Sequence, residues 1–343
     1  MATLISRALR TSLNQVRHVT PVRPAAATGL VADVYAQVER DFGMLAPPTA
    51  LHSPAPGPLA ASWAMLRETL LADGLVDRAS KEVVAATVSK DNECPYCVAV
   101  HGATVEGLLG TTEVDGAHQA IEDWTHAAVT AETARATGFP SAWLPELIGV
   151  AVTFQYLNRM VHIFLGESPL PPNVPDGMRG RAMKFLGGFM RKTAIKPHAP
   201  GAALALLPDA ELPADLAWAA GNPSIAGAMA RAAATIDAVD VPANVRELVS
   251  AEVDAWTGQA KGPSRRWVED AVAGLPIGDQ PAGRLALLTA LAPYQIDDGI
   301  VIGFRQMNLS DRALIELTSW ASMTAARRAG AWTWAGHTES TQS

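Results

Sequence analysis

Cysteine is scarce in this chain, because only two occur among its 343 residues. Two cysteines cannot build the framework of a disulfide-rich secreted domain, so we expect a reducing cytoplasm that recycles one pair. Charged residues are also few, at 18%, and the net charge of −7 argues against a general nucleic-acid binder. No uncharged apolar run reaches the roughly 18 residues of a membrane-spanning helix. We therefore expect a cytoplasmic protein that binds neither nucleic acid nor membrane.

Strand-like alternation is missing too, and apolar residues recur instead with the helical period in Ala-rich segments. At 49% hydrophobic residues, the chain can bury a substantial core. No Gly-x-Gly-x-x-Gly fingerprint of flavin or nicotinamide binding is present, so a redox centre in this chain would need an external electron donor. The predicted fold class is all-α. The predicted helices lie near 29–42, 58–73, 78–90, 95–109, 115–136, 141–165, 178–194, 213–220, 223–238, 242–257, 264–273, 281–292 and 310–330.

The two cysteines, Cys94 and Cys97, lie three positions apart. Fewer than about 1% of random placements of two cysteines in this chain would give that spacing. Pro95 suits the first position of a helix, which makes Cys94 its N-cap. The N–H groups and dipole of the helix start favour thiolate at both sulfurs. His101 follows Cys97 by four residues, so imidazole and thiol share one helix face. A dithiol, a helix N-terminus and a base are the parts of a redox-active disulfide centre.

The two sulfurs have different expected roles. Cys94, at the cap, should be the more exposed sulfur and the one that meets a partner disulfide. Cys97, one turn deeper, should lose its proton to His101, with its pKa lowered by one to a few units from about 8.5. The spacing leaves open which sulfur attacks a peroxide.

With Glu82 upstream, the spacing becomes Glu-x11-Cys-x2-Cys-x3-His, which resembles the alkylhydroperoxidase AhpD branch of the carboxymuconolactone decarboxylase superfamily. The resemblance is good over about residues 30–110 and loose elsewhere. The other segments that support it are Val34-Tyr35, Phe42-Gly43, Pro47-Pro48, Leu51-His52-Ser53-Pro54, Ser62-Trp63-Ala64-Met65-Leu66, Lys81-Glu82-Val83-Val84 and Val88-Ser89-Lys90-Asp91-Asn92.

This resemblance implies an AhpD-like helical fold without a bound cofactor or metal, and an enzyme of the peroxidase or disulfide-reductase kind. Cys94 and Cys97 would form the redox-active disulfide, with His101 and Glu82 as a proton relay. The oxidant would be a peroxide or a small disulfide, and an external dithiol or protein electron donor would restore the thiols. The resemblance also implies a homo-oligomer.

Breaker-rich stretches divide the chain into four parts. We predict an N-terminal arm over 1–28, an AhpD-like catalytic unit over 29–196, a linker over 197–213 and a degenerate second unit over 214–335. The arm is basic and has no acid before Asp33, so a transit peptide is an alternative interpretation.

The second unit is inferred from an internal parallel between Leu59–Arg67 and Pro223–Arg231. After a slip of one residue, Glu247 corresponds to Glu82. The positions of the dithiol and the histidine then carry Gln259, Gly262 and Arg266, so this unit would be structural. The alternative is that any two Ala-rich amphipathic helices align this well.

Other interpretations of the motif remain open. The cysteines are small buried hydrophobes or zinc ligands in two alternatives, and Glu82 is a solvated ion-pair partner in another. A carboxymuconolactone decarboxylase-like lyase and a non-catalytic metal-stabilised helical protein are the alternative functions. Tyr156 and His162 are interpreted as core residues. The basic amphipathic segment 179–192 is interpreted as a solvated helix face packed on the catalytic unit, with a membrane or partner contact as the alternative.

Overall fold

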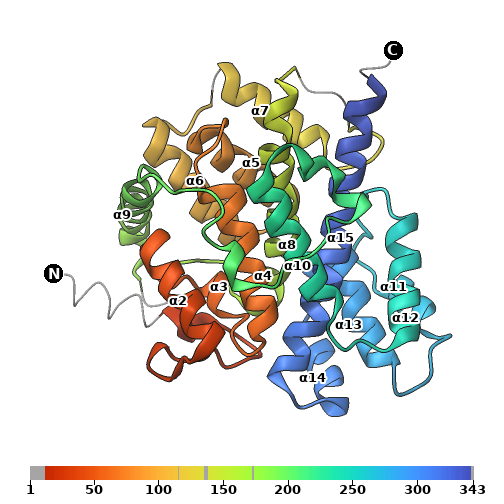
Figure 1. The fold of residues 1–343 in the computed structure, drawn as a ribbon. Helices are drawn as coiled ribbons and strands as arrows, with labels where there is room; N and C mark the ends of the chain where they lie inside the picture. Colours follow the sequence, from red (N-terminus) through yellow and green to blue (C-terminus); the bar gives the residue numbers. More distant parts are fainter. Residues whose placement is uncertain (1–11, 115, 135–137, 172–173, 341–343) are drawn as a thin grey trace.

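The structure is a computed structural model that describes residues 12–114, 116–134, 138–171 and 174–340. Over these residues the chain is helical and contains no β-strand, so the predicted all-α class is confirmed. Figure 1 shows the helices gathered into one body, with α8 (Leu144–Phe164) near its middle and α15 (Asp311–Ser340) packed beside it.

The other helices follow in chain order: α2 (Gly29–Asp41), α3 (Pro47–Ala50), α4 (Pro56–Leu66), α5 (Arg78–Asp91), α6 (Pro95–Leu109), α7 (Gly116–Ala127), α9 (Asp176–Ala194), α10 (Pro223–Asp237), α11 (Ala243–Ala255), α12 (Arg266–Val272), α13 (Gln280–Leu291) and α14 (Asp298–Met307). Several of them differ from the predicted helices. The sequence predicts no helix at α3 or at α14, and Asp297 caps α14 by accepting a hydrogen bond from the Ile300 N–H. Helix α7 ends well before residue 136, because the Ala131 N–H bonds instead to the Thr257 carbonyl.

Helix α8 is the core of the molecule, since nearly all of its side chains are buried. The few polar ones bond across to other helices. The Tyr156 hydroxyl donates to Ser319 Oγ on α15 at 3.0 Å, and Arg159 Nε donates to the Ala290 carbonyl on α13 at 2.9 Å. Tyr156 is therefore a core residue, as interpreted, and α8 joins the first half of the chain to the second.

The segment between the two halves, residues 197–213, is anchored by a buried ion cluster. Arg67 pairs with Asp41 at 2.8 Å and with Glu68 at 2.7 Å, and it also donates to the Ala199 carbonyl. The Glu68 carboxylate accepts the N–H groups of Gly201 and Ala203. The segment thus packs on the first half, although the sequence suggests only a connection.

The N-terminal arm also contacts both halves where the structure describes it, from residue 12 onward; residues 1–11 of the predicted arm lie outside the described residues. The Arg17 N–H donates to the Phe164 carbonyl in α8, and the Thr20 N–H donates to Asp311 at the start of α15. These bonds hold 12–28 against the ends of the two central helices.

Helices α5 and α6 form as the sequence predicts, and they hold the cysteine motif. Asp77 caps α5 by accepting the Ser80 N–H. Pro95 is the first residue of α6, and Gly110 ends that helix in the left-handed conformation at φ 76°. The two helices pack directly on each other.

Two glycines bring α9 very close to α6. A Cβ atom on Gly187 would lie 2.5 Å from the Ala103 carbonyl oxygen, and one on Gly107 would lie 2.7 Å from the Gly187 carbonyl oxygen. No side chain fits between these backbones, so both positions require glycine. This contact fixes α9, at the left of Figure 1, against the cysteine helix.

The two segments with parallel sequences fall on α4 and α10, and these helices pack against each other. Their surroundings differ further along the chain. Gln259 and Gly262 lie in the irregular segment between α11 and α12, and Arg266 is the first residue of α12. Glu247 is exposed on α11, whereas Glu82 is buried. The division into tandem units stays a prediction.

None of the helices in the described part of the chain is both long and apolar enough to span a bilayer.

The close approach of α6 and α9 gives the first testable prediction. Gly187→Ala should lower the free energy of unfolding by about 1–3 kcal/mol, because its methyl group would overlap the Ala103 carbonyl. The neighbouring Gly188→Ala is the matched control, since a Cβ there meets nothing within 4 Å. It should raise stability by about 0.5–1 kcal/mol through helix propensity. Urea denaturation of both variants is the measurement, and equal midpoints would contradict the close contact.

Candidate active site

The two cysteines lie at the start of α6, both reduced and both buried. Cys94 caps the helix, and its N–H donates to the Ser89 carbonyl of α5 at 2.9 Å. The Cys94 thiol donates to the Cys97 sulfur, with 2.9 Å between the two sulfur atoms. A disulfide bond measures about 2.05 Å, so a small side-chain movement closes it.

The predicted partners Glu82 and His101 meet across the α5–α6 contact. His101 Nδ1 lies 2.6 Å from Glu82 Oε2. The other carboxylate oxygen, Oε1, accepts two hydrogen bonds from Arg78, from Nε at 2.9 Å and from Nη2 at 2.7 Å. Glu82 is fully buried. The solvated ion-pair interpretation of Glu82 is therefore wrong.

The charge of Glu82 determines how the imidazole is used. Burial, the largest influence, raises the pKa of Glu82, but Arg78 and His101 together lower it below its ordinary value. The carboxylate is therefore ionised at neutral pH and accepts the Nδ1 proton of His101. In a neutral imidazole held this way, Nε2 is the nitrogen without a proton. Phe154 packs edge-on against the ring, with 4.5 Å between the centroids.

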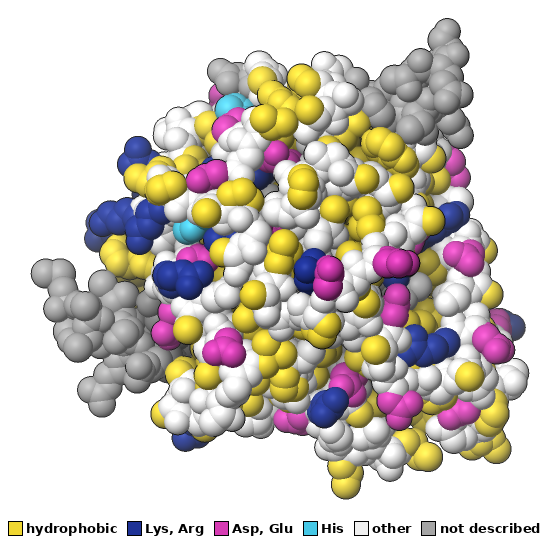
Figure 2. All heavy atoms as spheres, viewed as in Figure 1, with side chains coloured by type: hydrophobic (Ala, Val, Ile, Leu, Met, Phe, Trp, Pro, Cys, Tyr) yellow, Lys and Arg dark blue, Asp and Glu magenta, His cyan; other side chains and the backbone are white. Residues whose placement is uncertain are grey.

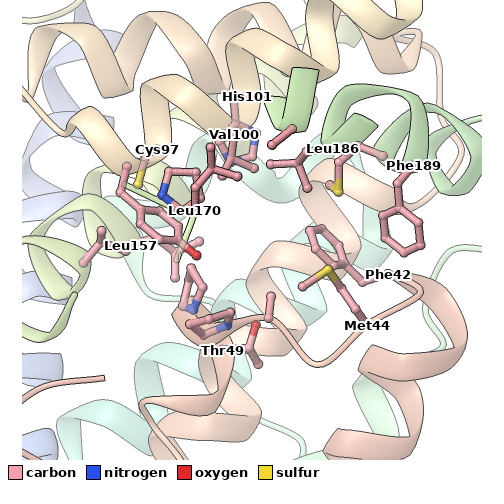
Figure 3. A pocket seen from close by; sticks show the side chains of 18 of the residues that line it. Phe42, Met44, Thr49, Cys97, Val100, His101, Leu157, Leu170, Leu186 and Phe189 are labelled. Carbon is pink, nitrogen blue, oxygen red and sulfur yellow. The ribbon is translucent and has the colours of Figure 1, made fainter. Parts of the chain in front are cut away.

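Beside these groups lies a cavity of about 410 Å³ (Figure 3). Its walls come from the residues just after α2, the segment around α3, the end of α4, and α6, α8 and α9, together with residues 169–174 where the structure describes them. Polar side chains are few. The lining residues are Phe42, Met44, Ala46, Pro47, Pro48, Thr49, Leu66, Tyr96, Cys97, Val100, His101, Phe154, Leu157, Val161, Pro169, Leu170, Pro171, Val174, Ala182, Phe185, Leu186, Phe189 and Met190.

Cys97 lines this cavity and Cys94 does not. Their exposed fractions are 4% and 1%, so the expectation that Cys94 is the more exposed sulfur is wrong. The Cys94 side chain is buried and hydrogen-bonds to the Cys97 sulfur. A ligand in the cavity therefore meets Cys97 first.

The expected fall in the pKa of Cys97 is also wrong. Burial is the largest influence, and together with the neighbouring Cys94 thiol it raises the pKa of Cys97 well above its ordinary value. Desolvation of a thiolate here outweighs the favourable field of the helix start. At neutral pH this thiol is therefore protonated.

Asn158 is a site residue that the sequence analysis missed. It is fully buried on α8, where its side-chain hydrogen bond to Cys97 counteracts part of the rise in the pKa of that thiol. Ser89 and Asn92 hold the amide in place, at 3.2 Å and 3.0 Å. An amide inside a long apolar helical segment was the available signal, because buried polar groups require partners.

Three further residues near the motif have simpler positions. Tyr96 lines the cavity, and Glu93 is exposed just before Cys94, with a positive φ of 51°. His162 is part of the α8 packing, where its Nε2 bonds to the Asn92 carbonyl at 2.9 Å. Among the described residues, no group of three or more His, Cys, Asp or Glu side chains is arranged to hold a metal ion.

No protein-family model matches this chain. A curated relative does: an alkyl hydroperoxide reductase of Mycobacterium tuberculosis is 38% identical over an alignment of 343 positions, which covers 92% of this chain and 94% of the relative. The similarity therefore extends over both halves of the chain and is not confined to the cysteine motif.

The protonated thiol beside His101 gives the second prediction. In a Cys94→Ser background, alkylation of Cys97 should accelerate as pH rises, because the raised pKa keeps the thiolate fraction small at neutral pH. His101→Ala should slow alkylation at pH 7 by roughly tenfold or more and move the titration to higher pH. The control His126→Ala removes a surface imidazole that pairs with Asp91, and it should leave the profile in place. Superimposable profiles for the two histidine variants would make His101 a packing residue.

Proposed function

Because this chain belongs to the same family as the alkyl hydroperoxide reductase of Mycobacterium tuberculosis, we propose that it is a thiol-dependent peroxidase of the AhpD type. One observation carries the proposal: Cys97 lines an apolar cavity beside an imidazole that a buried carboxylate holds in place. The reaction converts an organic hydroperoxide and two thiols into an alcohol, water and a disulfide.

In the first step Cys97 is the attacking residue. His101 Nε2 accepts the thiol proton, and the thiolate attacks the terminal oxygen of the hydroperoxide. The O–O bond breaks, the leaving alkoxide takes the proton back from His101, and Cys97 becomes a sulfenic acid. A positioned general base of this kind contributes roughly 10²–10⁴ in rate. Glu82 acts through His101 as a positioning residue.

In the second step Cys94 resolves the sulfenic acid. Its sulfur attacks the sulfur of Cys97, the S–O bond breaks, and the hydroxyl group leaves as water with the Cys94 proton. The 2.9 Å separation of the sulfurs supports this assignment, as does the position of Cys94 behind Cys97. The Asn158 amide stabilises the Cys97 thiolate that attacks the peroxide in the first step.

An external dithiol then restores the pair. Both sulfurs are buried, and Cys97 is reached through the cavity. This burial favours a small peroxide over a folded protein disulfide as the oxidant. It also favours an electron donor that is small, or that carries its thiols on a flexible arm. The carboxymuconolactone decarboxylase-like alternative loses support, because the lining residues include no Lys or Arg for a carboxylated lactone.

Single-turnover experiments separate the two cysteines. Cys97→Ser should abolish reduction of tert-butyl hydroperoxide. Cys94→Ser should still consume about one equivalent and accumulate a sulfenic acid on Cys97, which dimedone traps for mass spectrometry. A trapped adduct on Cys94 in the Cys97→Ser protein would reverse the assignment. Two unmodified thiols after peroxide treatment of the wild type would contradict the proposed function itself.

The glutamates at equivalent positions of the two predicted units form a matched pair. Glu82→Gln removes the charge that aligns His101 and should lower peroxide turnover by roughly ten- to a thousandfold. Glu247→Gln should leave turnover nearly unchanged, because Glu247 is exposed on α11. Circular dichroism checks that Glu82→Gln still folds, since it leaves Arg78 beside an uncharged amide. Equal kinetic effects of the two substitutions would show that the carboxylate beside His101 has no part in the reaction.

A further inference from the structure

The cavity has apolar walls, and the reactive side chains of Cys97 and His101 also line it. Among the described residues that line it, none is Lys, Arg, Asp or Glu. Its volume, about 410 Å³, falls within the roughly 300–1,000 Å³ of pockets that enclose drug-sized ligands. Hydrogen peroxide is close to water in size and would leave most of this space empty. The walls therefore match a large hydrocarbon group, with its reactive end at Cys97 and His101.

Helix α9 forms one wall and also reaches the mouth of the cavity. Leu186 and Phe189 line the interior, and Figure 3 shows them on the side of the cavity opposite Cys97. Phe185 also lines the cavity, yet 66% of its surface is exposed to solvent. A side chain that does both lies at the rim.

Two cations share the helix face of Phe185. Arg181 precedes it by four residues and Lys192 follows it by seven, which are the spacings of residues on one side of an α-helix. Both are exposed, and neither takes part in any hydrogen bond or ion pair among the described residues. Lys184 and Arg191 lie roughly 100–120° away around the helix.

These cations belong to a local excess of positive charge. Figure 2 shows Lys and Arg side chains gathered over α9, with hydrophobic side chains among them. The whole chain carries a net charge of −7, so this concentration is a local feature. Unpaired cations beside an apolar mouth attract a ligand that has an anionic group at one end and an apolar chain at the other.

We propose that the substrate is an anionic amphiphile, a hydroperoxide on a long hydrocarbon chain whose acidic head group stays at the rim of the cavity, attracted by the positive charge of Arg181 and Lys192. The chain enters the cavity past Phe185, and the hydroperoxide reaches Cys97. This inference rests on the proposed peroxidase function and adds the class of its substrate. A free fatty-acid hydroperoxide and an acidic phospholipid hydroperoxide in a bilayer share this chemistry.

Binding tests the head-group site without any turnover. Calorimetry would compare linoleate with its uncharged methyl ester on three proteins: wild type, Arg181→Gln/Lys192→Gln and the control Lys184→Gln/Arg191→Gln. The control removes the same charge from the same helix. Linoleate should bind the Arg181/Lys192 variant roughly three- to thirtyfold more weakly than it binds the wild type or the control. Methyl linoleate should show no such difference. Equal linoleate affinities in the two double variants would overturn the proposal.

Turnover then identifies the source of the substrate. For each protein, the kcat/KM of linoleic acid hydroperoxide is divided by that of tert-butyl hydroperoxide, which has no head group. This ratio should be lower in the Arg181→Gln/Lys192→Gln variant than in the wild type, and it should be unchanged in the control variant. The same comparison with phosphatidylglycerol vesicles that contain a phospholipid hydroperoxide shows whether the bilayer lipid or the free acid is the source. Unchanged ratios with both substrates would overturn the proposal.

The two experiments also separate this inference from the proposed function. If linoleate binding depends on Arg181 and Lys192 but the wild type reduces no hydroperoxide, the head-group site is supported and the peroxidase function is contradicted. If the wild type reduces tert-butyl hydroperoxide but linoleate affinities are equal in all three proteins, the peroxidase function is supported and the head-group site is contradicted.

Discussion

A buried carboxylate is the constraint on which the cysteine centre depends. Glu82 has no exposed surface, and a buried charge is tolerated only when charged or hydrogen-bonding groups surround it. Arg78 supplies two hydrogen bonds from the same helix, and His101 supplies the third from α6. The need to satisfy Glu82 therefore fixes how α5 and α6 pack. Because Cys97 lies four residues before His101, the same packing determines where the thiol faces.

Around this polar centre the protein places apolar walls that come from distant parts of the chain. Phe42, just after α2, and Phe189, on α9, both line the cavity. The glycine contact with α6 holds α9 in place. Exclusion of water from such a site has two effects on the thiol. It raises the pKa of Cys97, and it strengthens the hydrogen bond that the Asn158 side chain makes to this thiol. Reactivity then depends on groups aimed at the sulfur more than on the field of the helix start.

Local signals made much of the fold predictable. Pro95 defined the start of α6, and the helical period placed α5, α8 and α9 close to their observed bounds. The Glu82–His101 pairing came from the resemblance in the spaced motif. Burial could not be predicted in the same way. Which sulfur faces the cavity, the direction of the pKa shift at Cys97 and the presence of Asn158 all depend on α8 packing over the start of α6. That contact joins segments more than 50 residues apart.

The central claim is that Glu82 holds His101 in the tautomer that leaves Nε2 free to accept the Cys97 proton. The ¹⁵N chemical shifts of the His101 ring measure this directly. In the reduced protein above neutral pH, the account predicts a protonated Nδ1 and an unprotonated Nε2, and a mixture of tautomers in Glu82→Gln. A wild-type ring protonated at Nε2, or one whose tautomer does not respond to Glu82→Gln, would contradict the account.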